Sequence, residues 1–217
     1  MSPLLEALPT VLVAVFVVAV VALAIVGIGT IVWFASHVFS IPGVIVHEFA
    51  HATACRLVGV RVLEVVYFRF GDPAGYVRHE QPQQYREAFA VSVAPFLVNT
   101  LVAFAAFLGV ATLVVAGDIA SIDDVRTSPG ERLAALALLT WLGLSVGTYA
   151  FPSTGDANVL WTRSRLEWRR SPLVLLGLPV VAVIYLANLL SWLWADVLYA
   201  LGLLALAFAL LGNPVGV

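Results

Sequence analysis

The sequence has no lysine, and charged residues of any kind are scarce. Only 11% of the 217 residues are charged, 62% are hydrophobic, and the mean hydropathy is +1.02. Since a soluble domain carries roughly a quarter charged residues, this composition excludes a water-soluble globular protein. The 11 arginines are nearly balanced by 13 carboxylates and form no polybasic tract of the kind that binds nucleic acid. We therefore expect the lipid bilayer as a partner and no nucleic acid.

Cysteine is almost absent as well. The single cysteine, Cys55, excludes an internal disulfide and leaves no CxxC pair for metal or redox chemistry. A bound metal would therefore need other ligands. The apolar run 10–35 is too long for the core of a signal peptide, so we expect it to be a retained first span.

Long apolar runs dominate the rest of the chain, and a run of about 20 such residues can cross a bilayer. They lie at about 10–35, 41–59, 86–117, 132–151, 172–194 and 196–212. No internal repeat relates them, which argues against a repeat-built transporter. We predict an all-α polytopic membrane protein: a bundle of about six transmembrane helices forming a single integral membrane domain over residues 1–217.

The arginines are distributed unequally between the two sides of such a bundle. With six spans, segments 60–86 and 152–171 lie on the same side as both termini and hold eight arginines, while the opposite side has only Arg126 and Arg132. The positive-inside rule makes the arginine-rich side cytoplasmic. Both termini are therefore predicted to be cytoplasmic.

One segment on that side has the composition of a β-hairpin. Residues 60–70 are rich in β-branched and aromatic side chains, residues 71–75 read Gly-Asp-Pro-Ala-Gly, and residues 76–79 can form a return strand. We predict a small membrane-associated β-hairpin at about 60–80; the alternative is an interfacial loop. An open strand edge at membrane depth must be sheltered by protein or face water.

A second segment on that side is amphipathic. Residues 156–170 combine Trp161 and Trp168 with four arginines. That mixture suits a helix lying in the cytoplasmic headgroup layer.

The second span contains His47-Glu48-Phe49-Ala50-His51. Side chains four residues apart share one face of a helix, with Cβ atoms about 5–6 Å apart, so both imidazoles can reach one ion while Glu48 points toward a metal-bound water. This is the HExxH zinc pattern. Ionisable groups inside an apolar span are costly and usually mark a functional site. The alternative is that the three side chains only satisfy one another between helices.

A catalytic zinc needs a third protein ligand and leaves the fourth position to water. His51 lies about 12 Å from the cytoplasmic end of its span, at 1.5 Å per residue, so the third ligand should lie near the cytoplasmic end of another span. Asp156 does; its alternative role is that of a helix N-cap. His79 and Glu167 lie in more polar surroundings and are weaker candidates.

An HExxH in a transmembrane helix, followed by Ala-Pro-Phe-Leu-Val-Asn at 94–99 and Pro-Ser-Thr-Gly-Asp at 152–156, resembles the site-2 protease family of intramembrane zinc metalloproteases. The resemblance covers the predicted catalytic core at about 41–157. It implies one zinc ion (Zn²⁺) per chain, held by two histidines and an aspartate, and a hairpin that engages an unwound substrate.

The resemblance also implies a role for each site residue. His47, His51 and Asp156 would be the zinc ligands, Glu48 the general base, and Asn99 a polar partner of the substrate or intermediate. Asn99 has an alternative role, because a buried asparagine in a span often donates a hydrogen bond to a neighbouring helix.

We therefore expect zinc-dependent hydrolysis of peptide bonds in a transmembrane or membrane-associated protein substrate, near the cytoplasmic leaflet, at a site that opens to the cytoplasm. One alternative is a catalytically silent bundle that binds a partner helix. Another is a membrane zinc hydrolase of a different family, with a third ligand other than Asp156. The sequence indicates neither the cleavage sequence nor the oligomeric state.

Overall fold

The computed structural model describes residues 3–169 and 172–211 and is mostly helical, at 78%. Its helices are α1 (Pro3–Val58), α2 (Tyr85–Ala116), α3 (Ile122–Thr127), α4 (Gly130–Thr148), α5 (Thr154–Glu167), α6 (Leu178–Ser191) and α7 (Ala195–Leu211), with a short 3-10 helix at Pro172–Gly177. The strands are β1 (Val62–Val66) and β2 (Tyr76–His79). The chain divides into two compact units, residues 1–39 and 40–217.

Helix α1 contains both of the first two predicted spans. The sequence predicted a helix start near Pro42, but the structure keeps this proline inside α1. Residues 36–40 carry no glycine or proline that would end a helix, and this explains the difference. Within the first unit, the large apolar side chains between Leu12 and Phe34 are exposed, as expected of a helix surrounded by lipid.

In the part of the chain that the structure describes, two helices are long and apolar enough to cross a membrane. They are the Val15–Val58 part of α1 and the whole of α2. Helices α6 and α7 pass the same test only together, and they are bent by 103° at the break between them, so they make a third span if counted as one. These features are compatible with a membrane protein, but the predicted set of about six spans is not confirmed.

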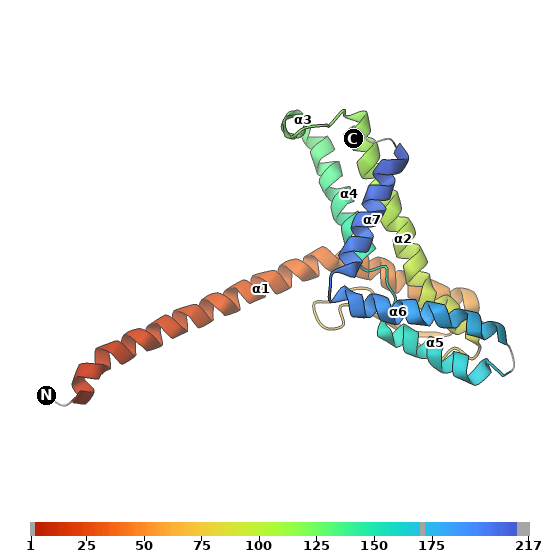
Figure 1. Cartoon of the computed structure of the whole chain (residues 1–217), viewed down its shortest axis with the longest axis horizontal. Helices are drawn as coiled ribbons and strands as arrows, with labels where there is room; N and C mark the ends of the chain where they lie inside the picture. The colour runs from red at the N-terminus through yellow and green to blue at the C-terminus, as the bar shows by residue number, and fades with distance from the viewer. Residues whose placement is uncertain (1–2, 170–171, 212–217) are drawn as a thin grey trace. The chain divides into compact units, whose positions relative to one another are not determined.

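Helices α2, α4 and α7 lie side by side in the second unit (Figure 1). The buried residues between them are mostly small: Ala103, Phe107, Ala111, Val146 and Ala207. Small side chains let helix backbones approach closely, which is how helices associate in membranes. A second cluster packs α5 and α6 against the first turns of α2, through Ala88, Ala157, Leu160, Val181 and Ile184.

The predicted β-hairpin is confirmed. Strands β1 and β2 are antiparallel, with Glu64 opposite Arg78 and an irregularity in the register between Val62 and Glu64. Arg78 forms an ion pair with Glu64 at 3.3 Å, and the Tyr76 hydroxyl donates to Glu64 at 3.0 Å. That hydrogen bond raises the pKa of Tyr76, and the phenol links the two strands as a donor.

Most of the predicted amphipathic segment 156–170 lies in helix α5, which ends at Glu167. Trp161 and Trp168 are exposed, and Arg170 lies outside the described residues.

Helix α1 approaches the end of α4 closely at Gly43. The Gly43 N–H donates to the Ser145 hydroxyl at 2.9 Å. A Cβ atom at Gly43 would lie 2.8 Å from Cδ2 of Tyr149 and 3.0 Å from the carbonyl carbon of Ser145, so only glycine fits without a backbone shift.

We expect Gly43→Val to destabilise the second unit by roughly 1–3 kcal/mol, the usual cost of forcing extra atoms into a packed interior. Thermal unfolding of the detergent-solubilised protein measures the effect. Gly27→Val is the matched control, because a Cβ there meets nothing within 4 Å. Equal melting temperatures for the two variants would show that the crossing at Gly43 is not tight.

Candidate metal centre

Three side chains that are far apart in the sequence meet in the second unit. His47 and His51 come from α1 and Asp156 from the first turn of α5, and one ligand atom from each lies within 4.8 Å of the others. His51 Nε2 is 3.7 Å from Asp156 Oδ2. Zinc ligands at about 2.1 Å in a tetrahedral arrangement lie about 3.4 Å from one another. The donor set therefore fits a zinc ion with only small adjustments.

Each histidine is oriented by a backbone carbonyl. Nδ1 of His47 donates to the Tyr149 carbonyl at 2.8 Å, and Nδ1 of His51 donates to the Val91 carbonyl at 3.0 Å. Because a carbonyl can only accept, Nδ1 carries the proton in each ring and Nε2 keeps its lone pair for a metal. Sequence reasoning missed these two acceptors, since a backbone carbonyl leaves no signature in the residue type.

The capping of α5 orients Asp156. Its Oδ2 accepts from the backbone N–H of Ser153 at 2.9 Å and from the Ser153 hydroxyl at 2.7 Å, and the hydroxyl accepts from the Asp156 N–H at 3.2 Å. The N-cap is thus Ser153, and Asp156 is the third residue of a reciprocal capping box. A carboxylate has two oxygens with several lone pairs, so capping and metal binding are compatible.

Asn99 shares a hydrogen-bond acceptor with His47. Its side chain is 0% exposed, and Nδ2 donates to the carbonyls of Tyr149 at 2.9 Å, Val146 at 3.3 Å and Gly43 at 3.4 Å. The Tyr149 carbonyl is the same one that accepts from His47. Asn99 therefore joins the end of α4 to α1 and holds the group that orients a candidate ligand. Its predicted contact with a substrate stays a prediction.

The hairpin turn packs directly against Glu48. Glu48 is 9% exposed, and a Cβ atom at Gly75 would lie 2.8 Å from its Cγ and 2.6 Å from Cγ1 of Val44. The lack of a side chain at Gly75 thus allows the turn to contact α1 beside the HExxH pattern. Strand β2 starts at the next residue, so its first residue lies next to the predicted general base.

The weaker candidates for the third ligand lie elsewhere. His79 ends β2 and Glu167 ends α5, and neither belongs to the group formed by His47, His51 and Asp156. Among the described residues this is the one cluster of three or more potential metal ligands.

Comparisons with known proteins found no relative. No model of a protein family, no curated protein and no solved structure matches the chain. The site is therefore interpreted from its own residues and geometry.

We expect Asn99→Leu to lower the affinity for Zn²⁺ by ten- to 100-fold, as is typical when a partner behind a ligand is removed. The reason is that the Tyr149 carbonyl would lose one of its two anchors. Competition with a chromogenic chelator measures the affinity without any substrate.

Thr112→Val is the control for that measurement, because the Thr112 hydroxyl donates within its own helix, to Leu108 at 2.7 Å. Unchanged zinc affinity in Asn99→Leu together with lost turnover would instead assign Asn99 to substrate binding.

Proposed function

We propose that this protein is an intramembrane zinc metalloprotease, similar to the site-2 protease family, that hydrolyses peptide bonds of membrane-embedded protein substrates. The observation that supports the proposal is the convergence of His47, His51 and Asp156, with Glu48 beside them on α1. Structural zinc sites have four protein ligands, whereas catalytic sites have three and an open position. A set of three therefore favours catalysis over a structural role.

Each group around the candidate metal centre has a separate role in the proposed hydrolysis. A bound zinc ion would lower the pKa of a water molecule toward 7 and polarise the scissile carbonyl. Glu48 takes the proton from the attacking water and delivers it to the leaving amine. The carbonyls of Tyr149 and Val91 fix the tautomer and orientation of both imidazoles, so that Nε2 of each ring would face a bound ion.

The hairpin supplies a template for an extended substrate. A helical substrate hides its amide groups in internal hydrogen bonds, so it must unwind before cleavage. In the described residues β2 pairs with β1 alone, and its other edge is available for strand addition. Because Gly75 contacts Glu48, a peptide on that edge runs past the general base.

We also propose about six membrane crossings, in which residues 10–35 and 41–59 cross separately, with both termini and the opening of the site on the cytoplasmic side. The support is the concentration of arginines in segments 60–86 and 152–171, which contain the hairpin and the whole of α5. Protease protection of tags at the two termini in sealed vesicles tests this topology. Two tags on opposite sides would contradict it.

Metal analysis of detergent-purified protein, prepared without chelator, tests the proposed function. We expect about one zinc per chain in the wild type and markedly less in Asp156→Ala, since two histidines alone bind the ion weakly. A wild-type protein that takes up no zinc would contradict the proposal and favour a catalytically silent helix bundle.

Glu48→Gln is the matched control, because it preserves shape and removes the base without removing a ligand. We expect it to keep its zinc and to lose at least 10²-fold in the cleavage of labelled transmembrane peptides, the usual contribution of a general base. Undiminished turnover would refute the role of Glu48.

A further inference from the structure

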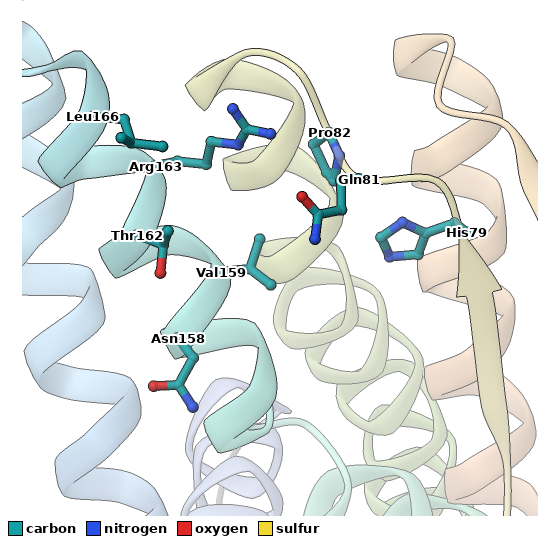
Figure 2. Close-up of a pocket in the computed structure, with 8 residues that line it drawn as sticks. All are labelled: His79, Gln81, Pro82, Asn158, Val159, Thr162, Arg163 and Leu166. Atoms are coloured by element: carbon teal, nitrogen blue, oxygen red, sulfur yellow. The ribbon is translucent and has the colours of Figure 1, made fainter.

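A pocket of about 270 Å³ lies between the end of β2 and α5, outside the set of candidate metal ligands (Figure 2). Its polar lining comes from His79, Gln81, Asn158, Thr162 and Arg163. None of the residues that line the pocket is acidic. The pocket therefore presents one permanent positive charge with no carboxylate to neutralise it.

Two polar side chains of the pocket, Arg163 and Asn158, present donors. Nη1 of Arg163 donates to the Gln83 carbonyl at 3.2 Å, which holds the guanidinium in place and leaves its other N–H groups available. Oδ1 of Asn158 accepts from the Tyr185 hydroxyl at 2.6 Å. The Nδ2 group of Asn158 is therefore the end of this amide that can donate to a ligand. Such a lining is complementary to an oxyanion, and a guanidinium can bind a carboxylate through two parallel hydrogen bonds.

The segments that line the pocket, α5 and the end of β2, also lead to the candidate metal centre. Asn158 follows Asp156 by two residues in α5. Strand β2 leads from Gly75, against Glu48, to His79 at the pocket. At about 3.3 Å per residue, a peptide along β2 would place a side chain in the pocket three to four residues from the bond at Glu48.

We propose that this pocket is a substrate subsite for the carboxylate of an aspartate or glutamate about three to four residues from the scissile bond. The inference rests on the proposed protease function. The volume suits a single side chain, since sites for drug-sized ligands are about 300–1,000 Å³. Val159 and Leu166, which also line the pocket, contact the methylene groups, and Arg163 pairs with the carboxylate.

A peptide fits this pocket better than a lipid phosphate. The exposed Trp161 and Trp168 mark the side of α5 that suits the headgroup layer, and they share one face because they are seven residues apart. Arg163 is two residues from Trp161, which turns it away from that face by about 200° at 3.6 residues per turn. The arginine of the pocket therefore faces the β2 side of the helix.

Binding of matched peptides tests the subsite without requiring cleavage. Zinc-loaded Glu48→Gln protein in detergent is titrated with fluorescent transmembrane peptides that carry a single Glu or Gln at successive juxtamembrane positions, and fluorescence anisotropy reports binding. We expect at least fivefold tighter binding of the Glu peptide at one or two adjacent positions. Adding Arg163→Gln makes the two peptides bind alike, and Arg163→Glu reverses the preference toward a Lys peptide.

Arg165→Gln is the matched control, because Arg165 lies on the same helix, is exposed and does not line the pocket. It keeps the preference for Glu. Equal zinc content and circular dichroism in both arginine variants show that neither change acts through misfolding.

Several results would overturn the subsite. One is equal binding of Glu and Gln peptides at every position. Another is a preference for phosphatidylglycerol vesicles that Arg163→Gln abolishes, without discrimination between peptides, because it would assign the pocket to lipid phosphate.

Cleavage of the same peptides by the wild type separates this inference from the proposed function. Turnover that is indifferent to Glu at every position overturns the subsite and leaves the protease standing. A binding preference that depends on Arg163, with no turnover of any peptide by the zinc-loaded wild type, supports the anionic subsite and overturns the protease.

Discussion

The carbonyl of Tyr149, at the C-terminal end of α4, is the contact on which the candidate site depends. It accepts one hydrogen bond from Nδ1 of His47 at 2.8 Å and another from Nδ2 of Asn99 at 2.9 Å. The last carbonyls of a helix have no partner within it, and here two side chains from α1 and α2 supply partners. Four residues later the chain reaches Ser153, which caps α5 and fixes Asp156. A shift at the end of α4 would thus disturb ligands from two helices together.

Further contacts hold the connection between α4 and α5 on several sides. Nδ2 of Asn188 in α6 donates to the Pro152 carbonyl at 2.8 Å, and the Phe151 ring lies against Phe96 of α2 and Tyr199 of α7. Interhelical hydrogen bonds in membranes contribute about 0.6 kcal/mol each, so the rigidity of the connection comes from their number. A preorganised carboxylate is what a metal centre needs, because ordering it on binding would cost affinity.

The sequence by itself determined the parts of this protein that depend on local chemistry. The composition predicts a membrane environment, and the four-residue spacing of His47 and His51 places both rings on one face of any helix. Turn residues 71–75 predict the hairpin that the structure contains. The depth of His51 in its span was enough to favour Asp156, which the structure brings within reach of both histidines.

The tertiary structure alone decided the features that depend on which segments meet. The acceptors for the histidines are the backbone carbonyls of Tyr149 and Val91, and every residue has such a carbonyl, so the sequence contains no signal for them. The continuity of α1 was equally hidden, because Pro42 can start a second helix or lie inside one continuous helix, and residues 36–40 contain no glycine or proline that would end the first. The pocket between His79 and Arg163 forms only because residues 79–82, at the end of β2 and just after it, face α5, and that adjacency is a property of the packing rather than of either segment.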